Sequence, residues 1–418
     1  MSDTTRLWHP FADQAEVKEA RFLVDRAEGV WVFDADGRRY LDATAGLWYC
    51  NVGHGRAEIV EAAAAQMRKL DTYFVFNDYT NEPSERLASR LSELAPMDDA
   101  TVFLTTGGGE SIDTAAKLAR QYWTRKGEPE RTHIISRGNA YHGSNGMGTS
   151  ITGIPANRTG FGDLVTDTSR VAHDDAEELA AAIEEIGPER VAAFFAEPVI
   201  GAGGLYPPPE GYLEKVAEIC ARYGVLFVAD SVICGFGRLG TWFGVERWNL
   251  RPDMITFAKG VTSGYLPLGG VIVSGRVSEP FWTPGGGPFR HGPTYSGHPT
   301  VTAAALANLD ILGSDGLLER GKELEGPLYA TLSGLLEHPA VTEVRGGIGL
   351  LGAVELAPEI LAADPTASFR AAKAIRELGV ITRPLAKGLA VSPPLTVTED
   401  EIETIGKTIS AGLDTFGS

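Results

Sequence analysis

The run MITFAKGVTSGYLPLGG, residues 254–270, places a single lysine, Lys259, at the end of an apolar stretch. The loop that follows is rich in glycines and hydroxyl residues and is a poor place for a solvated charge. Desolvation lowers the pKa of a lysine and favours the neutral amine, which can attack a carbonyl carbon and form an imine. The ordinary alternative is a lysine whose head reaches solvent.

Two carboxylates also follow apolar runs. Asp230 ends VLFVAD, and Glu197 ends VAAFFAE. A partly buried carboxylate needs a cationic partner, and a protonated ring nitrogen would serve Asp230. A helix cap or turn is the common alternative for Asp230, and a structural hydrogen-bonding role is the alternative for Glu197.

A glycine turn follows the apolar run TVFLT, residues 101–105. Gly107, Gly108 and Gly109 open a segment with apolar residues at helical spacing, so their backbone amides and the helix dipole suit a phosphate. The turn matches neither the dinucleotide fingerprint nor the nucleoside-triphosphate loop, and a plain tight turn is the alternative. Tyr141 and His142 lie in another glycine-rich loop, where a ring could stack on a flat cofactor or simply pack.

An imine-forming lysine, a carboxylate for a pyridinium nitrogen and a phosphate cradle are together what pyridoxal phosphate requires. These groups must come from one sheet edge, because parallel sheets bind ligands at the carboxyl ends of their strands. Apolar runs alternate with helical segments between residues 50 and 300, which predicts an α/β domain with a largely parallel sheet buried on both faces.

Three segments are predicted: residues 1–50, the N-terminal part of a smaller α+β domain; residues 51–300, the large domain; and residues 301–418, the C-terminal part of the smaller domain. The first contains a hairpin around an Asp-Gly turn, in GVWVFDADGRRYLDAT. The last helix opens with Thr398 and Glu401 at capping-box spacing.

The chain has 418 residues and a formal net charge of −18, which argues against nucleic acid or an anionic membrane as the main partner. Its three cysteines form no CxxC pair and fit a reducing cytoplasm. We expect no signal peptide in MSDTTRLWHPFADQ, no membrane span and no metal site.

The sequence resembles class III pyridoxal-phosphate aminotransferases of fold type I, specifically the ω-transaminases or amine–pyruvate transaminases. The resemblance covers nearly the whole chain. Its motifs are HPFAD, AGLWYCNVGHG, YHG, AEPVIGAGG, VADSVICGFGRLGTWFG, FAKGVTSGYLPLGG, HGPTYSGHP and RPLAKGLAVSPPL.

The resemblance implies that Lys259 forms the imine with the cofactor and shuttles a proton, and that Asp230 keeps the pyridine nitrogen protonated. Gly108 and Gly109 would bind the phosphate, and Thr294 would reach the phosphate of a neighbouring subunit. Tyr141 would stack on one face of the ring and Val232 on the other. The full predicted cofactor set is Gly108, Gly109, Tyr141, His142, Glu197, Asp230, Val232, Lys259 and Thr294.

The resemblance also implies a substrate pocket at the interface of a homodimer, with a tetramer as the alternative assembly. The predicted lining is Phe11, Trp48, Phe76, Tyr141, Ala202 and Arg383. Arg383 resembles a mobile arginine that pairs with the carboxylate of a keto acid, which suits the two parallel hydrogen bonds of a guanidinium. A surface arginine before a proline is the alternative.

One position departs from the family pattern: Ser231 stands where an acidic residue usually follows the aspartate. A serine cannot supply that charge, so any salt bridge made there must be absent or replaced. Because Asp230 is retained, we expect activity to persist, with stability or cofactor retention open to change.

We therefore expect an (S)-selective transaminase that moves an amino group from a primary amine or ω-amino acid to a keto acid such as pyruvate, in a ping-pong cycle via pyridoxamine phosphate. The amine donor is not legible. The adenosylmethionine–8-amino-7-oxononanoate aminotransferases and the aminomutases on the same fold are alternatives. A nicotinamide-dependent oxidoreductase would explain the glycine turn but not Lys259.

Overall fold

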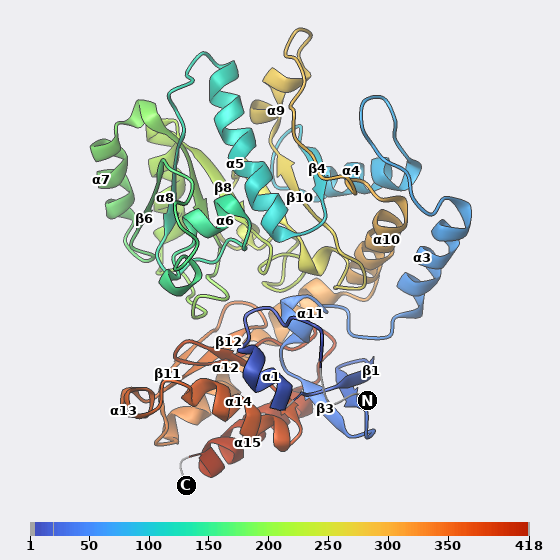
Figure 1. Cartoon of the computed structure of the whole chain (residues 1–418), viewed down its shortest axis with the longest axis vertical. Coiled ribbons are helices and arrows are strands. Elements are labelled where there is room, and N and C mark those ends of the chain that lie inside the picture. The colour runs from blue at the N-terminus through green and yellow to red at the C-terminus, as the bar shows by residue number, and fades with distance from the viewer. Residues whose placement is uncertain (1–4, 20, 417–418) are drawn as a thin grey trace.

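The computed structural model describes residues 5–19 and 21–416. Figure 1 shows a larger part that holds the central sheet and a smaller part that contains both described ends of the chain. The first four residues of the segment tested for a signal peptide lie outside the described residues. The predicted α/β class is confirmed, and the domain boundaries at residues 50 and 300 stay predictions.

The central sheet has seven strands in the order β4-β10-β9-β8-β7-β5-β6. Their bounds are β4 Thr101–Thr105, β5 His133–Arg137, β6 Thr168–Val171, β7 Val191–Ala196, β8 Leu226–Asp230, β9 Met254–Phe257 and β10 Gly269–Val273. All pairs from β9 to β6 are parallel, whereas β10 is antiparallel to both β4 and β9. Strand β4, which precedes the glycine turn, is therefore separated by β10 from β9, which precedes Lys259. The four strands that end in candidate site residues, β4, β7, β8 and β9, are not all neighbours in the sheet.

Alternate residues of the central strands pack into two different cores, which explains their continuous apolar runs. Phe195 and Val228 lie in one core with Ile112 of α5. Phe194 and Phe227 lie in the other with residues of α7 and α8. The sheet is thus buried on both faces, as predicted, and only its edges and strand ends are open to ligands.

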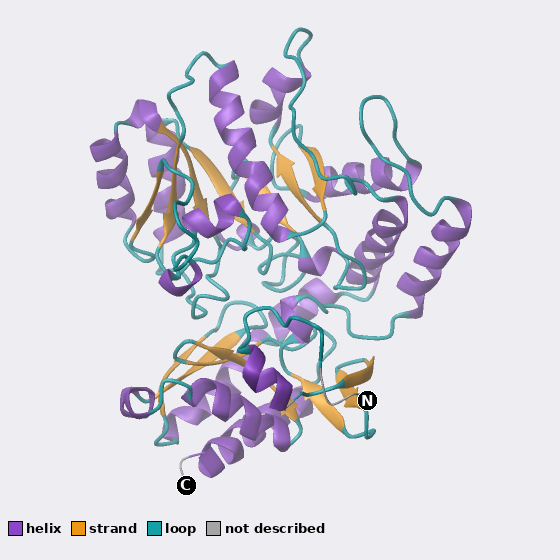
Figure 2. Ribbon diagram, viewed as in Figure 1, coloured by secondary structure: helices purple, strands orange, loops and turns teal. Residues whose placement is uncertain are grey.

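The helices of this part surround the sheet (Figure 2). They are α3 Ala57–Lys69, α4 Glu82–Leu94, α5 Gly108–Arg125, α6 Gly146–Ile151, α7 Ala176–Ile186, α8 Tyr212–Tyr223, α9 Gly275–Trp282 and α10 Pro299–Ser314. Short 3-10 helices cover Pro155–Asn157, Pro188–Arg190, Val245–Trp248, Lys259–Val261 and Gly334–Glu337.

The two ends of the chain share a sheet in the smaller part, in the order β1-β2-β3-β13. Strands β1 Val24–Glu28, β2 Trp31–Asp34 and β3 Arg39–Asp42 contain the predicted hairpin, and β13 Val380–Ile381 pairs in parallel with β3. A second sheet runs β11-β12-β15-β14. Its strands are β11 Val341–Arg345, β12 Gly352–Leu356, β14 Arg383–Leu385 and β15 Gly388–Val391.

The remaining helices are α1 Gln14–Glu19, α2 Ala45–Trp48, α11 Leu317–Glu323, α12 Glu325–Ser333, α13 Pro358–Ala363, α14 Ala367–Glu377 and α15 Glu399–Phe416. The capping box before α15 is confirmed: the Thr398 backbone N–H donates to Glu401 Oε2 at 2.9 Å, and the Glu401 N–H donates to Thr398 Oγ1 at 3.3 Å. In the described chain no single helix is long and apolar enough to cross a membrane, although one bent pair, Pro299–Ser314 with Leu317–Glu337, passes by length and composition.

Candidate active site

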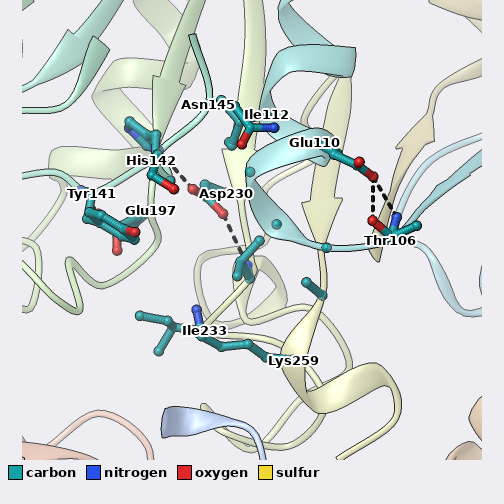
Figure 3. A pocket seen from close by; sticks show the side chains of 17 residues that line it. Thr106, Glu110, Ile112, Tyr141, His142, Asn145, Glu197, Asp230, Ile233 and Lys259 are labelled. Carbon is teal, nitrogen blue, oxygen red and sulfur yellow. Dashed lines mark hydrogen bonds and ion pairs between the residues drawn. The ribbon is translucent and has the colours of Figure 1, made fainter. Parts of the chain in front are cut away.

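A cavity of about 370 Å³ opens at the carboxyl ends of the central strands. Apart from Thr294, the predicted cofactor residues line it: Gly108, Gly109, Tyr141, His142, Glu197, Asp230, Val232 and Lys259. Figure 3 shows Glu197 and Asp230 near the ends of β7 and β8, Tyr141 and His142 on the loop after β5, and Lys259 after β9, gathered around the cavity. The cavity is therefore built where strand-end reasoning places it.

Asp230 is buried and each of its carboxylate oxygens is engaged. His142 Nδ1 lies 2.8 Å from Oδ2. Oδ1 accepts hydrogen bonds from Thr256 Oγ1 and from the Val232 backbone N–H, both at 3.1 Å. These three contacts fix the orientation of a carboxylate that faces the cavity (Figure 3).

Lys259 begins a 3-10 helix directly after β9 and has a φ of 46°, an uncommon backbone conformation for a residue with a side chain. Burial lowers the pKa of its amine, and the negative charges of Asp230 and Glu197 oppose that shift. Lys259 is thus the predicted amine: desolvated, beside Asp230, and open to the cavity.

The glycine turn brings backbone close to its neighbours. Gly107 gives α5 no side-chain cap, so the first-turn N–H groups of the helix have no partner within it. A Cβ on Gly108 would lie 3.1 Å from Val232 Cγ1, and one on Gly109 would lie 3.2 Å from Asn145 Oδ1. Larger residues would close the space in front of these amides, which is the space an anion would need.

Glu197 joins two loops of the site. Its Oε1 accepts from the Tyr141 backbone N–H at 3.0 Å, and its Oε2 accepts from the Gly201 N–H at 2.9 Å. Burial raises the pKa of Glu197, His142 opposes that shift and Asp230 reinforces it. These bonds show a structural hydrogen-bonding role for Glu197, the alternative left open by the sequence. The same bonds position Tyr141 at the cavity wall.

The structure places Trp48, Ala202 and Arg383 beside the cavity rather than in its lining. Trp48 is buried in a cluster that includes Ile233, a cavity residue, and Ala202 packs against that cluster. The Arg383 guanidinium lies over the Trp48 ring, 4.9 Å from its centroid. Burial lowers the pKa of Arg383, whose charge acts on both Tyr141 and Lys259.

Phe11, Phe76 and Thr294 are exposed on this chain. Phe11 lines a second cavity that shares Tyr141 with the first. Phe76 lies against the loop that carries Thr294, since a Cβ on Gly292 would be 3.3 Å from its ring. Within one chain these residues are not brought to Lys259.

Several residues of the site were missed by sequence reasoning. Thr256 donates to Asp230 from the middle of an apolar run. Its polar side chain next to the apolar Ile255 is the sequence signal that could have identified it. Asn145 and Ile233 also line the cavity; Asn145 lies two residues after the YHG motif, and Ile233 lies within VADSVICGFGRLGTWFG. Ser231 is buried, and its Oγ has no hydrogen-bond partner among the described residues.

Comparison with known proteins identifies the family. The sequence matches the class III aminotransferases over residues 12–413. The chain belongs to this family. It is 39% identical over 422 residues to a putrescine–pyruvate aminotransferase of Pseudomonas aeruginosa, covering 95% of this chain and 91% of that protein.

Solved structures of class III aminotransferases superpose closely on the chain. An (S)-enantioselective ω-transaminase from Thermomicrobium roseum matches with a TM-score of 0.95 at 40% identity, over 98% of this chain and 96% of the other. An amine transaminase from an uncultivated Pseudomonas species, solved with pyridoxal phosphate bound, matches with a TM-score of 0.94 at 34% identity, over 99% of both chains. The predicted fold type and enzyme class are therefore confirmed, and the cofactor is pyridoxal phosphate.

The donor set of the cavity fits that cofactor. Gly108 and Gly109 would offer amides to the phosphate, Asp230 a carboxylate to the ring nitrogen, and Lys259 an amine to the aldehyde. Tyr141 is placed at the wall where a ring would stack. Each group has the chemistry that its counterpart on the cofactor requires.

Proposed function

We propose that this aminotransferase is an ω-transaminase, which transfers an amino group from a primary amine or ω-amino acid to a keto acid such as pyruvate in two half-reactions. Bound pyridoxal phosphate supplies the electron sink and carries the amino group between the halves. One observation carries the proposal: Arg383, a cation able to bind a carboxylate, lies on the Trp48 ring beside the Lys259 cavity.

Lys259 acts at Nζ. Because burial lowers its pKa, the neutral amine is available to accept a proton from the substrate carbon and to return it. The Asp230 carboxylate would pair with the protonated ring nitrogen, and its contacts with His142 and Thr256 keep it in place.

Arg383 and Trp48 separate the two substrates. A keto acid presents a carboxylate, which a guanidinium binds through two parallel hydrogen bonds. An amine with an apolar side chain presents no charge at that place, so the Trp48 ring receives it instead. We also propose (S)-selectivity, which the 40% identity with the (S)-enantioselective ω-transaminase from Thermomicrobium roseum supports.

We also propose a homodimer that works in the cytoplasm. Tyr73, Phe74, Phe76 and Tyr79 form an exposed aromatic cluster, with ring centroids 4.7–6.3 Å apart. Thr294 and Tyr295 are exposed on the loop that Phe76 touches. A second subunit would cover this apolar surface and bring Phe76 and Thr294 to the neighbouring cavity.

The visible spectrum of the purified protein tests the chemistry. We expect an absorption band of bound cofactor that disappears with (S)-1-phenylethylamine and returns with pyruvate. Lys259→Ala should abolish this cycle, whereas Lys69→Ala, an exposed lysine paired with Glu82, should leave it unchanged. An unchanged cycle in Lys259→Ala would refute the mechanism.

Four further measurements test the finer points. Faster turnover of (R)- than (S)-1-phenylethylamine would refute the selectivity, and a monomer mass in sedimentation would refute the dimer. Return of the absorption band with S-adenosylmethionine but not with pyruvate would indicate the adenosylmethionine–8-amino-7-oxononanoate alternative. The absence of any free carbonyl product would indicate an aminomutase.

A further inference from the structure

A buried carboxylate outside the cofactor cavity holds the loop that carries Trp48. Asp42 ends β3 and is 2% exposed. Its Oδ1 accepts from the backbone N–H of Thr44 at 3.1 Å and from Thr44 Oγ1 at 3.0 Å. Its Oδ2 accepts from the Gly46 N–H at 2.7 Å and lies 3.0 Å from His54 Nε2. Both oxygens are therefore committed to residues 44–54.

The backbone of this loop is in an unfavourable conformation. Ala45, Gly46 and Trp48 have φ values of 45°, 66° and 58°. Residues with side chains rarely adopt positive φ, and such conformations persist only where the surroundings impose them. The hydrogen bonds from Asp42 to Thr44 and Gly46 hold the segment directly before Trp48. The Trp48 N–H in turn donates to the Thr44 carbonyl at 2.9 Å.

The fourth partner of Asp42 is itself fixed. The His54 backbone exchanges two hydrogen bonds with Gly29, at 2.8 and 3.0 Å, at the turn between β1 and β2. The Trp48 loop is thus connected through Asp42 and His54 to the N-terminal hairpin. A residue with a side chain would be strained in place of Gly46, because a Cβ there would lie 2.5 Å from the Tyr49 ring.

We propose that Asp42 is a positioning residue for the substrate pocket, which sets the place of the Trp48 ring and thereby the preference for aromatic over small amines. This inference rests on the proposed function, in which Trp48 receives the apolar part of the amine. Asp42 touches no cavity residue and acts only through the loop. Its effect falls on amines large enough to reach the ring, and a small amine reacts at Lys259 without it.

The test is Asp42→Asn in the holoenzyme, with 1-phenylethylamine and 2-aminopropane compared as donors to pyruvate. Asparagine keeps one acceptor oxygen but places an NH₂ group against the Gly46 N–H. We expect the ratio of kcat/KM values, aromatic over small amine, to fall at least about tenfold, since small misplacements of substrate-contacting groups have effects of that size. The kcat with 2-aminopropane should stay within about twofold of the wild type.

A second readout does not depend on activity. Acrylamide quenching of tryptophan fluorescence should increase in Asp42→Asn, because the buried Trp48 ring becomes accessible. On a Trp48→Phe background, Asp42→Asn should add no further quenching and no further change in the substrate ratio, which is the test of coupling between the two residues. If the wild type turns over neither amine, the proposed function fails while the quenching experiment still tests Asp42.

Asp34→Asn is a matched control. Asp34 also accepts backbone N–H groups in a turn, from Asp36 and Arg38, and a hydroxyl from Tyr40, but it holds no pocket residue. We expect no change in the ratio or in quenching. If Asp42→Asn does not fold, His54→Leu removes one partner of Asp42 and should shift both readouts in the same direction, by about twofold to threefold. A folded Asp42→Asn, or His54→Leu in its place, with both readouts unchanged would overturn the proposal.

Discussion

The floor and the wall of the active site are built in different ways. The floor, Asp230, Lys259, Gly108 and Gly109, comes directly from the ends of buried strands and the start of α5. What we call the wall, Trp48, Ala202 and Arg383 beside the cavity lining, comes from the N-terminal segment, a turn after β7 and the C-terminal segment. The floor is therefore fixed by the core of one sheet, whereas the wall depends on contacts between distant segments.

The contacts that hold the wall are polar and long-range. Arg345 on β11 donates to the carbonyls of Gly204 and Leu205, at 2.9–3.2 Å, beside the turn that carries Ala202. Its NH1 also bonds Glu355 Oε2 at 2.6 Å. Such a wall can change shape by substitution at a few positions while the sheet is unaffected, so one floor can serve aminotransferases with different amines.

The largest expected effect is on the floor. Asp230→Asn removes the negative charge that holds the ring-nitrogen proton, and we expect kcat for both half-reactions to fall at least about 100-fold, the effect of about 3 kcal/mol for a charged hydrogen bond. Stopped-flow absorbance with amine and with pyruvate measures both. Thr256→Val removes one donor to the same carboxylate and should cost about tenfold or less. Equal losses in the two variants would contradict a role for the charge.

For the wall we expect a smaller effect, confined largely to the half-reaction with pyruvate. Arg383→Ala should raise KM for pyruvate about 10- to 100-fold, because a charged hydrogen-bond partner of the carboxylate is lost. The half-reaction with 1-phenylethylamine should change less than about threefold. Arg376→Ala is the control, since that guanidinium lies over the Phe22 ring instead. An equal loss in both half-reactions would show that Arg383 supports the floor and not the acceptor.

The floor could be predicted from the sequence for a physical reason. A strand buried on both faces must be apolar, so a charged residue at its end, such as Asp230 or Lys259, stands out. The glycine turn before α5 stands out in the same way. What this reasoning missed was the position of β10 between β4 and β9, because strand order depends on contacts between segments far apart in sequence.

The wall could not be predicted in the same way. Trp48 and Arg383 were identified by resemblance, and nothing in local sequence shows that the guanidinium lies on the ring. Asp42 contacts Thr44 and Gly46 locally, but its contact with His54, which pairs with Gly29, forms only when the chain is folded. Local propensity carries no signal for such contacts.

The lowered pKa of Lys259 makes a prediction about stability. The pKa of Lys259 is lower in the folded protein than in the unfolded chain, where it is about 10.4. At pH values between the two, the unfolded chain binds more protons than the folded protein, so the cost of the buried ammonium decreases as pH rises through this range. In cofactor-free protein, Lys259→Met should raise Tm at pH 7 by roughly 1 °C, the change that about 1 kcal/mol produces in a chain of 418 residues, and the difference should shrink toward pH 10. Lys69→Met should show no such pH dependence. A Tm below that of the wild type at pH 7 would contradict a desolvated lysine.

The smallest expected effect concerns the one departure on the floor. The Ser231 hydroxyl is buried without a partner, so Ser231→Ala removes an unsatisfied polar group and should leave the free energy of unfolding unchanged or raise it by less than about 1 kcal/mol. Urea unfolding measures this. Ser111→Ala is the matched control, because the equally buried Ser111 hydroxyl bonds Thr105 Oγ1 at 2.9 Å and the Gly107 carbonyl at 3.0 Å, and its loss should cost about 1–2 kcal/mol. If Ser231→Ala destabilised the protein as much as Ser111→Ala, the serine would have taken over the structural role of the missing acid, and the floor would tolerate less variation than its geometry indicates.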